Sequence, residues 1–204
     1  LTLKLLQNLP FPLAAPSANP FGYISPTSPA HVLQNLGDKV LYILDGGPCE
    51  LGIESTIVGL GDDCLLIYRL GAISVEKIAT IAKTDNIKII TDVSRQIEFP
   101  GLSKTHYAPH KKMILGDIEE LLKSHDLKNV GILSFKNIHS QIDLEKQVIL
   151  SRKGSLEEAA KHLFSALRKL DQLQIPTILA EYVPDEGLGR AINDRLTRAA
   201  AKTK

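Results

Sequence analysis

The stretch "SLEEAAKHLFSALRKLDQ" (155–172) decides the fold class of the second half of this 204-residue chain. Apolar residues recur in it every three or four positions, which predicts a helix with one buried face. Ser155 and Glu158 have the spacing of a capping box, so the helix should begin at this serine. The apolar positions are Leu156, Ala159, Leu163, Phe164, Leu167 and Leu170.

Short apolar runs lie on both sides of this helix and alternate with further helical patterns. Such strand–helix alternation predicts a small parallel sheet wound with helices. We therefore expect a Rossmann-like α/β domain over residues 113–204. The runs are "KMIL" (112–115), "NVGILSF" (129–135), "QVILS" (147–151) and "PTILAEYV" (176–183), and the additional helical patterns are "DIEELLKSH" (117–125) and "AINDRLTRAA" (191–200).

The first half has a different pattern, with short β-branched runs that each end in Gly or Asp. They predict strands joined by tight connections, and they are "KVLYILDGG" (39–47), "STIVGL" (55–60) and "CLLIYRLG" (64–71). Helices are expected over 29–36, behind a Ser28 cap, and over 74–83. Residues 98–112 contain Pro and Gly and fit neither pattern, so we interpret them as a linker that follows a first domain of residues 1–97.

Composition narrows the class of protein. The net charge of +1 argues against a nucleic-acid-binding protein held by a broad basic surface. The sequence contains neither an apolar run of roughly 20 residues nor a signal-peptide pattern, so we expect a cytoplasmic protein that does not contact membranes. Cys49 and Cys64 are too few for a disulfide framework or a zinc site, and we expect buried or idle thiols.

Hydroxyl and amide side chains are concentrated in "PLAAPSANPFGYISPTSP" (12–29). If this proline-rich segment is extended, Ser17 and Asn19 point the same way, and Thr27 belongs to a second group farther along. Neutral donors on a stiff loop bind a charged or hydroxylated ligand with little loss of entropy. The same residue types also form turns and helix caps, and Ser28 is expected to be only a cap.

A second polar group lies in "GIESTIV" (52–58), which places Glu54, Ser55 and Thr56 at the start of a strand. Arg69 ends the next apolar strand just before a glycine turn. By itself, an arginine at a strand end is typical of a surface ion pair. Together with the hydroxyl groups of the two polar stretches, it is suited to binding and polarising phosphates. We find no catalytic-triad, Walker or metal-site signature in the sequence, so no catalytic nucleophile and no metal ligand is assigned.

At these motifs the chain resembles the two-domain threonylcarbamoyl-adenylate synthases, whose catalytic part has the YrdC-like fold. The resemblance implies a partial YrdC-like α/β domain with a twisted sheet, then the linker, then the Rossmann-like domain. The matching stretches are "PLAAPSAN", "SPT", "ILDGG", "GIESTIV", "YRLGAI", "PGLSKTHYAP" and "GLGRAINDRLTRAA".

The resemblance also implies a nucleotidyltransferase. Its members join L-threonine, bicarbonate or carbon dioxide, and ATP into threonylcarbamoyl-adenylate and pyrophosphate, for later modification of an adenosine in tRNA. Magnesium would accompany ATP, and the partners would be these substrates and the downstream tRNA-modification machinery. Family members carry a threonine-rich strand and a basic K-x-R motif upstream of the matching region; this chain begins after both, and we expect the isolated chain to be inactive.

Carried over by motif, Ser17 and Ser55 would contact threonine, and Asn19, Thr27 and Arg69 would contact ATP. Two linker residues complete the assignment, with Tyr107 as a nucleotide contact and His106 as a lid candidate. Simple packing between the domains is the alternative role for these two residues.

Two other functions stay open. One is a non-catalytic module that binds RNA or a nucleotide through the second half, and the other is a regulatory fragment whose second domain only positions the linker. "GLGRAI" (187–192) lacks the third glycine of a dinucleotide-binding loop and is expected to begin the last helix. Arg190, Arg195 and Arg198 on that helix are expected to complement its carboxyl end or to face solvent.

Overall fold

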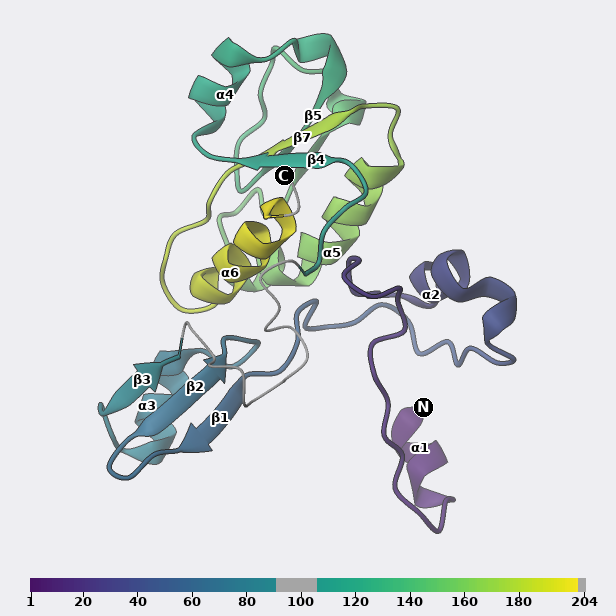
Figure 1. Ribbon diagram of the computed structural model, residues 1–204, viewed down its shortest axis with the longest axis vertical. Coiled ribbons are helices and arrows are strands. Elements are labelled where there is room, and N and C mark those ends of the chain that lie inside the picture. The colour runs from purple at the N-terminus through teal and green to yellow at the C-terminus, as the bar shows by residue number, and fades with distance from the viewer. Residues whose placement is uncertain (91–105, 202–204) are drawn as a thin grey trace.

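The computed structural model describes residues 1–90 and 106–201, which form an α/β fold built on two separate sheets (Figure 1). The predicted α/β class is confirmed. Of the predicted linker, residues 98–105 lie outside the described residues. The proposed domain limits at residues 97 and 113 stay a prediction.

The larger sheet lies in the second half and has the strand order β4-β7-β5-β6. All three neighbouring pairs are parallel, as the strand–helix alternation predicted. The strands are β4 (Lys112–Leu115), β5 (Val130–Ser134), β6 (Gln147–Ile149) and β7 (Thr177–Ala180). The helices are α4 (Ile118–Ser124), α5 (Leu156–Gln172) and α6 (Gly189–Ala200), with short 3-10 turns η2 (Leu127–Asn129) and η3 (Leu144–Lys146).

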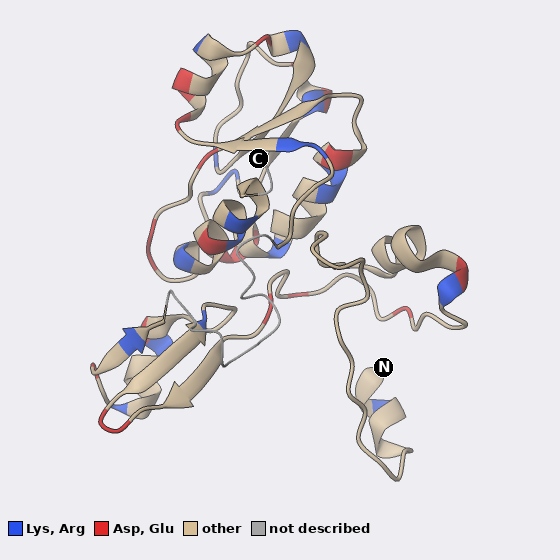
Figure 2. Ribbon diagram, viewed as in Figure 1, with Lys and Arg blue, Asp and Glu red and all other residues tan. Residues whose placement is uncertain are grey.

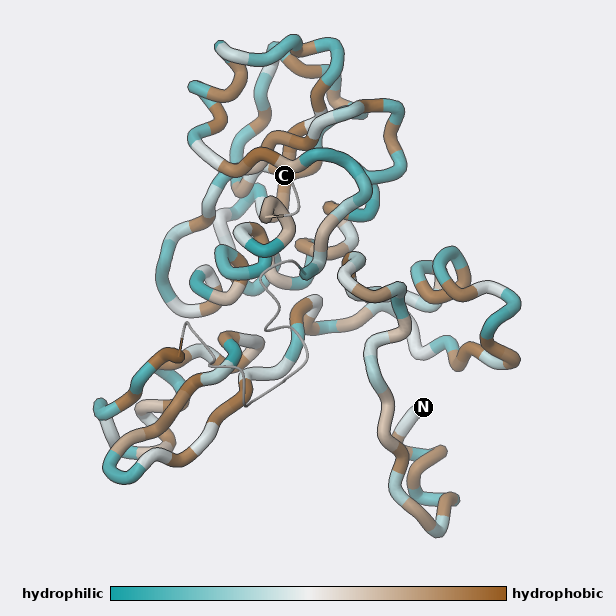
Figure 3. Tube along the Cα trace, viewed as in Figure 1, coloured by the Kyte–Doolittle hydropathy of each residue, from teal (hydrophilic) through white to brown (hydrophobic). Residues whose placement is uncertain are grey.

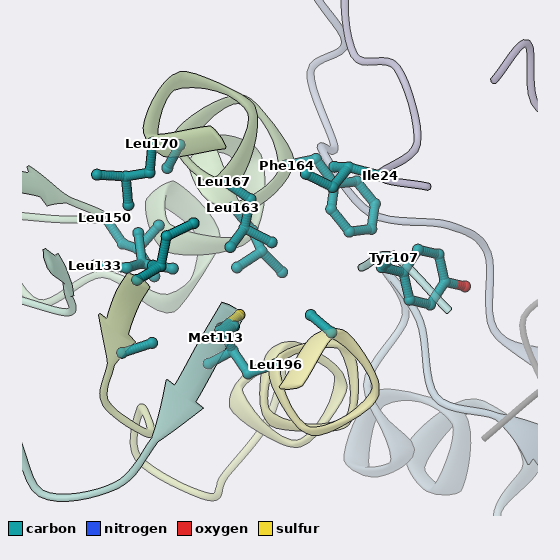
Figure 4. Packing of buried hydrophobic residues seen from close by; sticks show 14 of the residues in the cluster. Ile24, Tyr107, Met113, Leu133, Leu150, Leu163, Phe164, Leu167, Leu170 and Leu196 are labelled. Atoms are coloured by element: carbon teal, nitrogen blue, oxygen red, sulfur yellow. The ribbon is translucent and has the colours of Figure 1, made fainter. Parts of the chain in front are cut away.

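Helix α5 begins directly after its cap residue Ser155, as the capping pattern predicted. The Glu158 carboxylate does not bond directly to the Ser155 backbone N–H; the Ser151 hydroxyl lies between them. The Ser155 hydroxyl accepts a hydrogen bond from the Glu158 backbone N–H at 3.2 Å. The backbone N–H of Ser155 donates to the Ser151 hydroxyl at 2.9 Å, and that hydroxyl donates to the Glu158 carboxylate at 2.5 Å. The apolar face of α5 packs into the main core, where Leu163, Leu167 and Leu170 are fully buried (Figure 4).

The smaller sheet has the order β1-β2-β3, with β1 antiparallel and β3 parallel to β2. Its elements are β1 (Ile57–Leu60), β2 (Leu65–Arg69), α3 (Val75–Ala82) and β3 (Ile87–Ile89). The strands predicted at 55–60 and 64–71 and the helix predicted at 74–83 are confirmed. Strand β3 was not predicted because three residues are too few to show a period.

The strand predicted at 39–47 is wrong. The chain forms helix α2 (Pro29–Leu36) and the 3-10 turn η1 (Gly37–Lys39) and then runs irregularly. Leu41 and Tyr42 are 91% and 88% exposed, and Figure 3 shows the hydrophobic residues of this outlying segment. The run has strand-like composition, but no strand pairs with it within the described ranges, and a strand requires hydrogen-bonded neighbours.

Three further features of the first half concern a helix cap, the start of the chain and the two cysteines. Ser28 caps α2, its hydroxyl accepting from the His31 backbone N–H at 3.4 Å, as predicted. The apolar start of the chain forms helix α1 (Thr2–Gln7). Cys49 is exposed rather than buried, and Cys64 is half-buried; both are free thiols. None of the described helices is both long and apolar enough to cross a membrane.

The segment around Tyr23 docks the first half onto α5. Tyr23 and Ile24 are part of the main core, and the Tyr23 hydroxyl donates to the Asp171 carboxylate at 2.8 Å. Arg168 is 2% exposed and donates to the Ile24 and Ser25 carbonyls, so its guanidinium bonds directly to the loop backbone. The hydroxyl-rich loop is therefore held by the second half of the molecule.

Candidate functional site

Ser55 and Arg69, predicted from separate motifs, are in contact. Pairing of β1 with β2 sets Ile57 opposite Arg69, which brings the guanidinium back over the start of β1. Arg69 Nε donates to the Ser55 carbonyl at 3.0 Å, and Nη2 donates to the Ser55 hydroxyl at 3.1 Å. Gly71 allows the backbone after β2 to lie close to the backbone before β1, because a Cβ atom at position 71 would lie 2.3 Å from the Ser55 carbonyl carbon.

Glu54 lies directly beside this pair and is held from two sides. Its Oε1 accepts from the Ser25 hydroxyl at 3.0 Å, which ties it to the hydroxyl-rich loop. Its Oε2 accepts from Arg195 of α6, at 3.1 Å from Nη2 and 3.3 Å from Nε. Arg195 also donates to the Leu70 carbonyl at 2.5 Å. The carboxylate therefore joins three segments that are far apart in the sequence.

The expectation that the α6 arginines complement the helix end or face solvent is wrong for Arg195 and incomplete for the others. Arg195 is fully buried, because position 195 lies on the buried face of α6 with Ile192 and Ala199. Arg190 reaches Glu76 at the start of α3, at 2.8 Å. Arg198 Nε donates to both oxygens of Asp194, at 2.9 and 3.0 Å. Figure 2 shows both charge signs interspersed along α6.

Tyr107 lies between the two halves, with its ring in the core. The ring stacks on Phe164 of α5 with centroids 5.2 Å apart, and the Arg195 guanidinium carbon lies 5.5 Å from the ring centroid. In Figure 4 the Tyr107 hydroxyl points away from the labelled leucines. Burial raises the pKa of Tyr107 to about 12, and the carboxylate of Glu54 acts in the same direction. The packing role that was the alternative for Tyr107 is thus present, and a ligand role stays a prediction.

His106 contacts the Tyr107 ring edge-on, with centroids 4.1 Å apart. Burial lowers the pKa of His106; Glu54 opposes this shift, and the nearby guanidinium groups of Arg198, Arg195 and Arg69 reinforce it. Its Nδ1 atom is buried and has no hydrogen-bond partner among the described residues. The neutral form of His106 is therefore favoured beside several cations.

Burial also lowers the pKa of Arg69, and its neighbours Tyr107 and Glu54 oppose the shift. The cation-rich surroundings of Ser55 thus contain the Glu54 carboxylate, which Arg195 and Ser25 already occupy. A hydroxyl and a guanidinium in this arrangement can bind and polarise an anionic group.

Some residues of the hydroxyl-rich loop (12–29) contact the group around Ser55 and Arg69, and others do not. Asn19 Nδ2 donates to the Pro20 and Tyr23 carbonyls, both at 3.0 Å, while its Oδ1 is buried without a hydrogen-bond partner among the described residues. The backbone N–H of Asn19 donates to the Ser17 carbonyl at 3.0 Å, so residues 17–19 form a tight turn and not the extended segment that was expected.

Ser17 is exposed, and the Thr27 hydroxyl lies 3.3 Å from His31 Nδ1 inside the start of α2. Phe21 connects the loop to the cluster through an edge-on contact with His106, with centroids 6.5 Å apart. The structure thus brings Ser55, Arg69, His106 and Tyr107 together. Within the described ranges, no hydrogen bond, ion pair or ring contact joins Ser17 or Thr27 to them.

Arg195 is a component of this site that was not predicted from the sequence. A signal existed, because position 195 continues the apolar spacing of the last helix, where a buried arginine requires a partner. No group of three or more His, Cys, Asp or Glu side chains in the described part of the chain could hold a metal ion.

Comparison with known proteins gives consistent results for both halves. Residues 73–201 match the family model "Threonylcarbamoyl-AMP synthase, C-terminal domain", and residues 1–71 match the model "Telomere recombination". The threonylcarbamoyl-AMP synthase of Bacillus subtilis is 33% identical over 208 residues, covering 98% of this chain and 60% of the relative. That of Pyrococcus abyssi is 33% identical over 215 residues, covering 98% and 61%.

Solved structures are similar over the same range. P. abyssi Sua5 complexed with L-threonine matches with a TM-score of 0.80 and 32% identity, covering 93% of this chain and 58% of that one. A doubly substituted form of the same protein matches with a TM-score of 0.82 and 29% identity, covering 99% and 60%. The chain thus spans about 60% of the length of the curated relatives it matches first.

Proposed function

Because the chain belongs to the threonylcarbamoyl-AMP synthase family, we propose that it provides the Ser55–Arg69 part of a site that joins L-threonine, bicarbonate and ATP into threonylcarbamoyl-AMP and pyrophosphate. The observation that supports this most directly is the contact between these two residues, which come from two separate motifs. The relative from P. abyssi has been solved with L-threonine, which supports threonine as a substrate.

The reaction class is nucleotidyl transfer. A carbamate oxygen of the carbamoylated threonine attacks the α-phosphorus of ATP, a new P–O bond forms, and the bond to pyrophosphate breaks. Such a step needs alignment of the reactants and neutralisation of developing charge more than it needs a protein nucleophile. Arg69 supplies a fixed positive charge and Ser55 supplies a hydroxyl held by it.

We assign the other residues that the family motifs predict as ligand contacts on the match of those motifs alone. Ser17 and Ser55 contact threonine, and Asn19, Thr27, Arg69 and Tyr107 contact ATP. Burial lowers the pKa of His106 and so favours its neutral form, which suits a lid that excludes water from the reactive adenylate.

Magnesium fits this site as the counter-ion of ATP and not as an ion held by the protein. The carboxylates of Glu54 and Asp194 act on the charge of Arg69, and arginine side chains pair with both of them. The phosphate oxygens of ATP are the ligands that magnesium prefers. The ion would neutralise triphosphate charge, while Arg69 and Ser55 orient the reacting end.

The setting we propose is the cytoplasm, with the tRNA-modification machinery as the downstream partner. We also propose that the chain by itself is inactive, because the basic K-x-R motif of the family is not among its residues. The family match does not favour the alternative of a non-catalytic RNA- or nucleotide-binding module.

The test is a fusion in which the chain receives the part of the B. subtilis relative that it lacks. Pyrophosphate release from ATP should require both L-threonine and bicarbonate in the fusion, and should fall to background in the 204-residue chain. Arg69→Ala should lower the rate in the fusion by about 10²-fold, the size of effect seen when one donor to a developing anion is removed. A well-folded fusion whose pyrophosphate release does not respond to threonine would refute the proposal.

A further inference from the structure

Arg195 bonds to the residues on either side of the Ser55–Arg69 pair. Its guanidinium donates to the carboxylate of Glu54, which precedes Ser55, and to the carbonyl of Leu70, which follows Arg69. One side chain of α6 therefore connects the segment that leads into β1 with the residue that follows β2. We infer that Arg195 is a positioning residue for the Ser55–Arg69 site, although it lies in the second half of the molecule.

Burial makes this connection obligatory. The Arg195 side chain is 0% exposed and that of Glu54 is 22% exposed. Moving the two segments away from α6 would break the bonds of a buried guanidinium to Glu54 and Leu70, which is strongly unfavourable. Glu54, Asp194, the Leu70 carbonyl and the Tyr107 ring all contact the guanidinium and hold its plane in one orientation.

Geometry favours arginine over lysine at this position. Arg195 uses Nε and Nη2 for Glu54 and Nη1 for Leu70, so the bonds point in different directions from one rigid plane. An ammonium group is a single point of charge and cannot span these acceptors with fixed angles. Arg195→Lys should therefore keep the charge and lose part of the positioning.

The same helix offers a matched control. Arg190 of α6 also forms an ion pair with the first half, with Glu76 of α3 at 2.8 Å, but both side chains are partly exposed. Removing it breaks a contact between the halves without touching Glu54 or Leu70. A purely structural role of Arg195 would make the two substitutions differ in stability only.

The experiment compares the unsubstituted chain with Arg195→Met, Arg195→Lys and Arg190→Met. The first readout is the Arg69 Nε–H resonance in NMR spectra, which reports its hydrogen bond to the Ser55 carbonyl. The second readout is the ATP dissociation constant from calorimetry; this part rests on the proposed function. Methyl resonances of the α5 leucines establish that each variant is folded.

We expect Arg195→Met to shift the Arg69 resonance, to speed its exchange with water and to weaken ATP binding at least about tenfold, which is 1.4 kcal/mol. Arg195→Lys should give a smaller change, and Arg190→Met should leave both readouts within twofold. If Arg195→Met does not fold, Glu54→Gln, which keeps the volume and removes the charge, should cause the same changes.

An unaltered Arg69 resonance in Arg195→Met, or an equal loss in Arg190→Met, would overturn the inference. If the unsubstituted chain and the fusion bind no ATP, the proposed function fails. The Arg69 resonance would still decide the inference in that case, since it needs no ligand.

Discussion

The two halves of the molecule differ in where their apolar side chains lie. In the second half, α5 and the parallel sheet enclose a continuous core (Figure 4). Among the described residues 1–90, the buried apolar side chains are Tyr23, Ile24 and Ile67, and the first two belong to the core of the second half. Apolar burial therefore stabilises the second half directly, whereas the first half depends on docking through Tyr23, Arg168 and Arg195.

The largest expected effect comes from separating the halves. Residues 106–201 expressed alone should keep their secondary structure and unfold cooperatively, because most of their core lies within that range. Residues 1–90 alone should lose α2 and β1–β3, since they bury too few apolar groups to offset the loss of chain entropy. Circular dichroism during denaturant titration checks both fragments. A cooperative transition of the 1–90 fragment would contradict the comparison.

A matched pair of substitutions tests the same contrast at single positions. Leu163→Ala removes a side chain that is 0% exposed in α5, and it should lower the free energy of unfolding by about 2–5 kcal/mol. Leu41→Ala changes a side chain that is 91% exposed and should alter it by less than about 0.5 kcal/mol. Chemical denaturation measures both changes. Equal losses would mean that residue 41 has a packing partner in solution.

The contrast also explains how much of the fold the sequence could predict. In the second half, spacing alone placed α5 and its cap, because local preference and tertiary burial agree at each turn. At 39–47 the composition is strand-like, but a strand also needs a neighbour, and sequence composition carries no information about whether a neighbour is present. The three-residue strand β3 was missed because it is too short to be periodic.

The sequence likewise predicted some residues of the site and missed others. The motifs singled out Ser55 and Arg69 separately, and the structure places them in contact because Ser55 lies just before β1 and Arg69 ends β2 in one antiparallel pair. Arg195 was expected to complement the carboxyl end of the last helix or to face solvent, although its position on the apolar face of α6 indicated burial. Whether such a residue has a partner depends on contacts more than a hundred positions away, which no local pattern encodes.

A smaller effect is expected at the docking contact itself. Tyr23→Phe keeps the ring in the core and removes the hydroxyl that donates to Asp171 at 2.8 Å. Loss of a buried hydrogen bond to a carboxylate should lower the free energy of unfolding by about 1.5–3 kcal/mol. Hydrogen exchange should show faster opening of residues 23–36 than of α5. A uniform change over both regions would mean that the halves unfold as one unit.

The smallest predicted effect is a pH dependence of the contact between the halves. Burial lowers the pKa of His31 and of His106 below their ordinary value of 6.5, and nearby guanidinium groups reinforce both shifts. His31 faces Arg168, and His106 faces Arg69, Arg195 and Arg198, with Glu54 as the opposing charge. Both histidines are thus neutral in the folded chain at pH 7.

The direction of the effect follows from proton binding. Below pH 6.5 the unfolded chain protonates these histidines before the folded chain does, so the free energy of unfolding should fall as the pH drops from about 6.5 toward the lowered pKa values. Above pH 7 they should contribute no slope. Protonation of His31 would also remove the acceptor at Nδ1 for the Thr27 backbone N–H, which lies 3.1 Å away.

His31 lies near Arg168 and His106 lies near Arg195, and both of these arginines join the two halves. Acid should therefore destabilise the first half before the second. Hydrogen exchange at pH 7 and at pH 5.5 measures this: protection should fall in 23–36 and in β1 and β2 while α5 keeps its protection. His106→Gln should reduce the loss in β1 and β2 and leave that in 23–36, since His31 is unaltered. Equal losses in α5 at pH 5.5 would show that the acid effect comes from groups inside the second-half core.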